Sequence, residues 1–213
     1  NIYGCTDSDA CNYNEDADFD DGSCEYNSGP TWYASVDGDD GNCGSEEYPF
    51  ASIQYAIDNT SDGDEVYVSA GTYYENINFN GKNISVIGEG RETTIIDGNQ
   101  NGVVVSFNGG SSYSLINGFT LANGQTSQSF GGGINIQNSS PKIENIYVIN
   151  SSNNGSGHAS GITISNGDND GNVIMKDVII TASDGDAGFY CFGATVDIEN
   201  LVSFSNGQKE LVI

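Results

Sequence analysis

A repeat of about 28 residues constrains the fold of this chain more than any other feature. Segments that begin at Val103, Gly133, Gly161 and Phe189 read VVVSF, GINIQ, GITIS and FYCFG, and their starts lie 30, 28 and 28 residues apart. Each is followed by a Gly/Asn/Ser turn and a second segment: SLINGFTLANG, KIENIYVINSS, IMKDVIITAS and DIENLVSFSNG. This period indicates a solenoid, because one coil of short strands cannot bury its inner face without neighbouring coils.

Stacking of such coils about 4.8 Å apart places equivalent side chains in columns. We predict one aliphatic column from Ile134 and Ile162, and a second from Ile146, Val178 and Leu201. Polar residues that precede the second column predict a structural ladder at a turn: Asn117, Asn145, Asp177 and Asn200. Amide side chains form such ladders in stacked strands. The less favoured interpretation of these residues is a metal or sugar site.

Residues 31–75 predict a cap for one end of the stack. Residues 31–36 alternate like a strand, and Pro49 precedes a helical pattern with Phe50, Ile53 and Ile57 on one face and Ser52 as candidate N-cap. A short strand at 66–68 and a turn at 71–73 follow. A lid of this kind protects an end strand that would otherwise recruit other chains.

This stretch resembles the N-terminal part of pectate-lyase-like right-handed parallel β-helix proteins. The matching residues are Tyr33-Ala34-Ser35 with Asp37-Gly38, Pro49-Phe50-Ala51-Ser52-Ile53-Gln54 with Ala56-Ile57, Gly63-Asp64 with Val66, and Gly71-Thr72-Tyr73 with Glu75. With the repeats, the resemblance covers about residues 30–213. It implies an all-β, right-handed parallel β-helix of about five coils with an N-terminal capping helix. It implies no single activity, because the superfamily contains lyases, esterases, hydrolases and adhesins.

The chain contains five cysteines, and three of them fall in the first 24 residues. Their spacing lacks a C-x2-C pair and a nearby histidine, which disfavours zinc. We predict two disulfides that stabilise a module too small for a core, with Cys43 as the partner of whichever module cysteine is left over and the pairing left open. The candidates are Cys5, Cys11, Cys24 and Cys43. Disulfides indicate an oxidising compartment. Cys191, between aromatic residues, is interpreted as a buried free thiol.

Residues 4–26 read GCTDSDACNYNEDADFDDGSCEY. They resemble a short cysteine module found in secreted proteins of marine and Bacteroidota-type bacteria. The matching residues are Gly4-Cys5-Thr6-Asp7, Ala10-Cys11-Asn12-Tyr13, Ala17, and Asp20-Asp21-Gly22-Ser23-Cys24. The resemblance implies a linker-like or adhesive accessory.

The chain has 30 acidic and 5 basic residues and a net charge of −25. Five cations cannot form a nucleic-acid-binding face, and the chain has no apolar run of about 18 residues for membrane insertion. Residues 1–75 contain 18 of the acids and neither Lys nor Arg. Self-repulsion at this density favours bound counter-ions, and carboxylates are the ligands that Ca²⁺ prefers. The predicted structural Ca²⁺ ligands are Asp16, Asp18, Asp20, Asp21, Asp37, Asp39 and Asp40.

Two alternatives to calcium stay open: a solvated acidic surface and a cluster of Asx turns without metal. A second calcium-like spacing, less favoured than the first, occurs at residues 166–171 together with Asp177. His158 is the only histidine, and it is interpreted as a solvated loop residue because it has no partner for metal binding or catalysis.

No catalytic residue is predicted. Lyase chemistry needs an Arg or Lys base, and Lys82, Arg91, Lys142, Lys176 and Lys209 do not cluster in the sequence. The expected organisation is a Cys/Asp-rich module at 1–27 that is a candidate for Ca²⁺ binding, a cap at 28–65, and β-helix coils at 66–213 that are incomplete at the C-terminus.

The favoured function is an extracellular, non-enzymatic module of a larger bacterial secreted or cell-surface protein. Its expected role is adhesion or the binding of polysaccharide or cell-surface glycans. The alternative is a fragment of a polysaccharide lyase, or of a related carbohydrate-active enzyme, with its active coils beyond Ile213.

Overall fold

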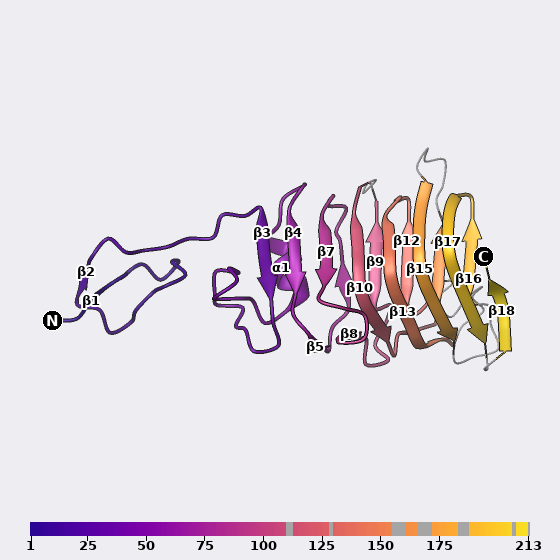
Figure 1. Cartoon of the computed structure of the whole chain (residues 1–213), viewed down its shortest axis with the longest axis horizontal. Coiled ribbons are helices and arrows are strands. Elements are labelled where there is room, and N and C mark those ends of the chain that lie inside the picture. Colours follow the sequence, from indigo (N-terminus) through magenta and orange to yellow (C-terminus); the bar gives the residue numbers. More distant parts are fainter. Residues whose placement is uncertain are drawn as a thin grey trace.

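The computed structural model describes residues 1–109, 113–127, 130–154, 161–165, 172–182, 188–205 and 208–212. The chain forms an elongated parallel β-solenoid, with the N-terminal module projecting from one end and strand β18 (Gln208–Val212) at the other (Figure 1). The predicted all-β parallel β-helix fold is therefore confirmed. None of the helices in these ranges is long and apolar enough to cross a membrane.

A long sheet forms one side of the solenoid. In spatial order its strands are β18, β17 (Thr195–Ser205), β15 (Asn172–Ala182), β13 (Lys142–Asn153), β10 (Leu115–Ala122), β7 (Ser85–Gly88), β4 (Glu65–Val68) and β3 (Thr31–Ala34). Three short strands pair beside this path: β5 (Gly71–Tyr73), β8 (Thr94–Asp97) and β11 (Gln125–Thr126). Neighbouring strands are parallel except for β17 and β18, which are antiparallel.

A second sheet forms another side. Its order is β16 (Phe189–Phe192), β14 (Ile162–Ser165), β12 (Ile134–Gln137), β9 (Val105–Asn108) and β6 (Ile77–Asn78). From β6 to β16 the chain makes four turns, so the solenoid has about four turns rather than five. The estimate was high because it divided all residues after Val66 by the repeat. It therefore counted the final β17–β18 pair, in which the chain reverses, as part of a coil.

The aliphatic columns are in the predicted register. Ile134 pairs with Ile162, and Ile146, Val178 and Leu201 follow one another across three strands. All five side chains are fully buried. Stacking like side chains in this way fills the interior from coil to coil, which is the main stabilising contribution that a solenoid has.

Three of the residues predicted to form the polar ladder share one column. Asn145, Asp177 and Asn200 occupy equivalent corners, each with a left-handed backbone (φ 52°, 54° and 58°). The Asn200 amide Nδ2 donates a hydrogen bond to Asp177 Oδ1 at 2.8 Å. Asn and Asp tolerate this conformation better than other residues with a Cβ atom, so the corner itself explains their recurrence.

Asn117 is not part of this column, and the prediction was wrong there. Asn117 pairs with Glu144, and Gly118 (φ 84°) occupies the corner instead. A Cβ atom on Gly118 would stand 2.6 Å from the carbonyl oxygen of Gly88, which holds the corner of the preceding coil. Because the backbones at this corner approach so closely, both coils require glycine there, as Gly88 and Gly118.

The cap contains the predicted helix. Helix α1 (Ile53–Asn59) begins after Ser52, and its buried face is Ile53, Ala56 and Ile57. The backbone of Phe50 pairs with β3 and covers that edge of the long sheet. Residues 71–73 form β5, paired with β8, and not the predicted turn, because the stacked coil below supplies a partner strand.

The N-terminal module is held by disulfides around a two-stranded sheet, β1 (Tyr3–Gly4) and β2 (Phe19–Asp20). Cys5 bonds to Cys24, and Cys11 bonds to Cys43, which ties the module to the cap. Cys191 is free, as predicted, but half-buried. The two disulfides favour an oxidising compartment.

Candidate functional site

Two stacked tyrosines begin an outward-facing column on the long sheet. Tyr33 of β3 pairs with Tyr67 of β4, and their ring centroids lie 5.8 Å apart at 25°. Parallel register places them one above the other because both point away from the core. Tyr67 remains 39% exposed, so part of this aromatic pair is open to solvent.

The pair lines a hollow of about 470 Å³. The cap contributes Glu46 and Ser35 to this hollow, and the ends of β4 and β7 contribute Ser69 and Glu89. Glu89 Oε2 also accepts a hydrogen bond from the backbone N–H of Ala70 at 3.0 Å. The hollow therefore combines an apolar ring surface with hydroxyl and carboxylate groups, and its lining contains neither Lys nor Arg.

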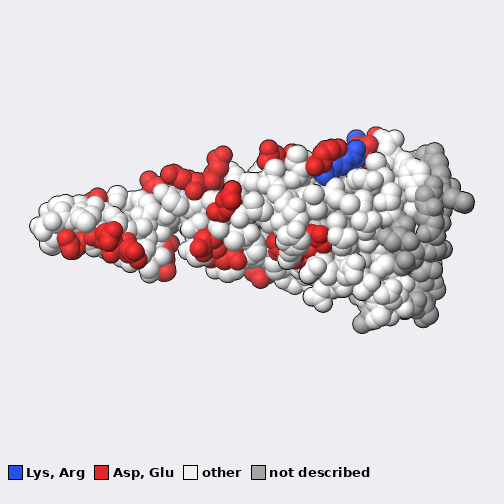
Figure 2. Space-filling model, turned by 90° about the horizontal axis from the view of Figure 1, so that it is seen from below, with Lys and Arg blue, Asp and Glu red and all other residues white. Residues whose placement is uncertain are grey.

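Acidic side chains dominate the electrostatics of this surface. The charge of Glu65, and then the hydrogen bond that Tyr67 Oη donates to Glu65 Oε2 at 3.2 Å, raise the pKa of Tyr67. In the view of Figure 2, acidic residues spread along the module and the cap, whereas Lys and Arg are visible at one place farther along the solenoid. The chain has 30 acids and 5 bases, so a polyanion meets an unfavourable field here.

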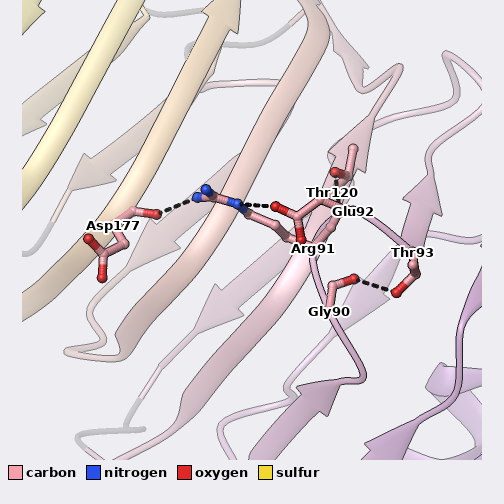
Figure 3. A network of polar contacts seen from close by, with 6 residues as sticks. All are labelled: Gly90, Arg91, Glu92, Thr93, Thr120 and Asp177. Carbon is pink, nitrogen blue, oxygen red and sulfur yellow. Dashed lines mark hydrogen bonds and ion pairs between the residues drawn. The ribbon is translucent and has the colours of Figure 1, made fainter.

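A second polar site surrounds Arg91, in the loop between β7 and β8. Its Nε lies 3.1 Å from Glu92 Oε1, and its Nη1 donates a hydrogen bond to the backbone oxygen of Asp177 at 3.3 Å (Figure 3). Thr120 Oγ1 donates to the Arg91 carbonyl at 2.6 Å. With Asn145 and Asn200, Arg91 and Asp177 line a hollow of about 250 Å³. These contacts join separate coils, so Arg91 has a structural role.

Two lysines of this sheet form ion pairs on the surface. Lys142 lies 3.6 Å from Glu144, and Lys176 lies 3.4 Å from Glu199. Exposed pairs of this kind contribute little to stability.

Three of the predicted calcium ligands in the module accept hydrogen bonds from backbone N–H groups. Asp18 Oδ2 accepts a hydrogen bond from Ile2 N, Asp20 Oδ1 from Gly22 N, and Asp21 Oδ1 from Ser23 N. Hydrogen bonds from the Ser23 side chain and backbone lower the pKa of Asp21. Asp16 donates its own N–H to Asn14 Oδ1. The backbone contacts Asp20–Gly22, Asp21–Ser23 and Asn14–Asp16 are Asx-type turns, which is the alternative to calcium that the sequence left open.

The second group of predicted ligands lies in the loop after β3. Asp39 Oδ1 accepts a hydrogen bond from Gly41 N, and Asp37 donates its N–H to Ser35 Oγ. Asp40 Oδ1 accepts from the N–H groups of Ala51 and Ser52 at 2.9 Å each. Among the described residues, no three His, Cys, Asp or Glu side chains gather in a group that could hold a metal ion. Calcium therefore stays a prediction.

Sequence reasoning missed the role of two carboxylates at the start of α1. Besides Asp40, Glu75 accepts hydrogen bonds from Ile53 N at 2.9 Å and Gln54 N at 2.8 Å. Burial raises the pKa of Glu75, against the lowering effect of these bonds. The available signal was a helix whose first N–H groups lack partners within the helix and must find acceptors elsewhere.

Two further predictions lie outside the described residues: the solvated loop histidine at His158 and the calcium-like spacing at 166–171. Comparisons with protein-family models, curated proteins and solved structures found no significant match. The resemblance of residues 4–26 to a bacterial cysteine module therefore stays a prediction, and function has to be argued from geometry.

Proposed function

We propose that this protein is a non-enzymatic extracellular module that binds a glycan on the outer face of its solenoid, around Tyr33 and Tyr67. The observation that carries the proposal is the stacked tyrosine pair, 5.8 Å between centroids, beside a hollow of about 470 Å³. Binding pockets combine an apolar and aromatic lining with a few placed polar groups, and this surface has that composition. A sugar ring presents C–H groups to an aromatic face and hydroxyl groups around its edge.

The polar groups around the tyrosines suit hydroxyl groups as ligands. Glu46 and Glu89 offer acceptors, and Ser35 and Ser69 offer hydroxyl groups that both donate and accept. Because carboxylates line the hollow and the chain has a net charge of −25, we expect a neutral glycan to bind better than a uronate polymer.

The column that begins with the tyrosines continues along the solenoid. The residues in register after Tyr67 are Ile87, Asn117, Glu144, Lys176 and Glu199. Strands repeat about every 4.8 Å, so equivalent positions recur regularly along one line. A long, straight surface of this kind suits a linear polymer, which supports polysaccharide over a small free sugar.

The compartment and the cation belong to the same proposal. The two disulfides favour an oxidising setting, and the extracellular space satisfies this requirement. A calcium-containing medium would also screen the 18 acids of residues 1–75.

Affinity electrophoresis in gels that contain neutral or uronate polysaccharides tests the proposal. A neutral polymer should retard the wild-type protein, and Tyr67→Ala should weaken the interaction about tenfold by removing the exposed ring. Tyr74→Ala is the matched control, because Tyr74 is 74% exposed and lies outside the hollow.

Two results would contradict the proposal. One is retardation that Tyr67→Ala leaves unchanged or that Tyr74→Ala reduces equally. The other is cleavage of a uronate polymer to unsaturated products, which would support the enzymatic alternative.

A further inference from the structure

A second hollow, of about 340 Å³, lies where the N-terminal module meets the cap. Its lining includes Asp9 of the module, Trp32 of β3, Asp40 of the cap loop and Tyr55 of α1. The Cys11–Cys43 disulfide joins the two sides, with 5.0 Å between the Cα atoms. The walls come from separate parts of the chain and are fixed relative to one another by a covalent bond.

Three aromatic residues, Trp32, Phe50 and Tyr55, are among the residues that line this hollow, whose surface is otherwise mostly polar. Trp32 stacks on Phe50 with 6.0 Å between centroids, and Phe50 meets Tyr55 edge-on at 5.0 Å. Phe50 is only 3% exposed and contacts both of the other rings. Tyr55 is 41% exposed, and Trp32 Nε1 donates to Asp64 at 2.9 Å, which fixes the indole ring.

The same hollow also carries negative charge from Asp9 and Asp40. The Asp40 carboxylate already accepts hydrogen bonds from the N–H groups of Ala51 and Ser52 and from Ser52 Oγ, just before α1. Asp9 is exposed, and no residue in the described ranges donates a hydrogen bond to its carboxylate or pairs with it. Residues 1–81 contain neither Lys nor Arg. Lys82 is committed to the carbonyl oxygens of Ile57, Asp58 and Thr60.

We propose that this hollow binds an organic ammonium group. Aromatic faces attract such cations, and a carboxylate adds a charge-assisted hydrogen bond. Calcium fits less well, because it needs six to eight oxygen ligands and gains nothing from the aromatic rings. The ammonium group of an amino sugar, a polyamine or a lysine side chain has the required chemistry. This site is separate from the tyrosine surface and does not depend on glycan binding there.

The protein provides its own probe, because Trp32 is its only tryptophan. Titration of the wild-type protein with butylammonium should change the tryptophan emission in a saturable way. Butan-1-ol, the neutral analogue, should not. Glucosamine, spermidine and Nα-acetyl-lysine amide, which keeps its side-chain ammonium group, are compared in parallel. Their relative affinities distinguish the natural sources of the ammonium group.

Two charge-removing variants make the test specific. Asp9→Asn should weaken butylammonium binding roughly fivefold to tenfold, because it removes the unpaired carboxylate. Glu15→Gln is the matched control in the same module: it makes the same charge change at an exposed residue outside the hollow and should leave the affinity unchanged. Tyr67→Ala should also leave it unchanged, which separates this site from the proposed glycan surface.

Three outcomes would overturn the proposal. The first is equal binding of butan-1-ol, which would mean that the charge is irrelevant. The second is an affinity that Asp9→Asn does not lower, or that Glu15→Gln lowers to the same degree. The third is displacement of butylammonium by Ca²⁺ at equal concentration, which would assign the hollow to a metal.

Discussion

Tyr73 illustrates how single buried polar groups connect the cap to the first coil. Its side chain is 4% exposed, and its hydroxyl lies 3.0 Å from the carbonyl oxygen of Ser69 and 3.3 Å from that of Ala34. Burial raises the pKa of Tyr73 to about 12. The sequence marked Tyr73 only as part of a predicted turn and of the resemblance to β-helix proteins, because a hydrogen bond across 39 residues depends on the completed fold.

The raised pKa of Tyr73 predicts a specific loss of stability in alkali. Since the folded-state pKa lies above the unfolded value near 10, the stabilisation is fully present below pH 10 and is lost as the pH rises towards 12. Tyr73→Phe should cost about 1 kcal/mol at pH 7, because it removes a hydrogen bond. Urea denaturation from pH 7 to 11.5 should show this difference shrinking above pH 10. A difference that stays constant to pH 11.5 would contradict the account.

At the scale of elements, the polar residues that recur once per coil are explained by the left-handed backbone at the corner within each long strand. The aliphatic pattern was sufficient to predict which residues stack. The corner was misassigned in one coil because Asn117 and Gly118 are both turn residues, and periodicity does not distinguish them. The close approach of Gly88 and Gly118 decides between the two, and it is a property of neighbouring coils.

Substitution at Asn145 tests this explanation. Its φ of 52° is costly for most side chains, so Asn145→Ala should lower the free energy of unfolding by about 1 kcal/mol. Asn145→Gly should be close to neutral, because glycine occupies the same corner one coil earlier. Glu144→Ala, next to it, has no such backbone requirement and serves as the control in urea denaturation. If the Ala and Gly substitutions lower the free energy of unfolding equally, the loss comes from the missing Asn side chain and not from the left-handed backbone.

At the scale of the whole molecule, a β-solenoid, a cap and a disulfide-bonded module form one elongated chain. The repeat and the helix pattern predicted most of this architecture, because stacking and amphipathicity leave direct marks on sequence. The pairing of the cysteines could not be predicted, since any of three connectivities fits four cysteines. The aromatic surface was also missed, because Tyr33 and Tyr67 are 34 residues apart and meet only through strand register.

The Cys11–Cys43 bond predicts separable stability for the module and the solenoid. Replacing both cysteines with serine should free the module from the cap and leave the solenoid core intact. Thermal unfolding followed by circular dichroism should keep its main transition within a few degrees, while proteolysis should cut near residue 27 much faster. A main transition that falls by 10 °C or more would mean that the module stabilises the coils directly.

The acidic N-terminal region predicts a response to calcium. Relieving repulsion among 18 carboxylates should raise the melting temperature in Ca²⁺ relative to EDTA at the same ionic strength. Mg²⁺ at equal concentration is the control for general screening. An unchanged melting temperature would contradict the proposal that the protein binds Ca²⁺.

The stacking of coils in register is the claim on which the rest depends, and distances between spin labels measure it most directly. With Cys191→Ser, one label replaces Glu199 and the other replaces Asn117, Ile87 or Tyr67 in turn. These residues lie three, four and five strands away in one column. At about 4.8 Å per strand, the account predicts distances of about 14, 19 and 24 Å. Distances that do not rise in equal steps, as in two antiparallel layers packed face to face, would contradict it.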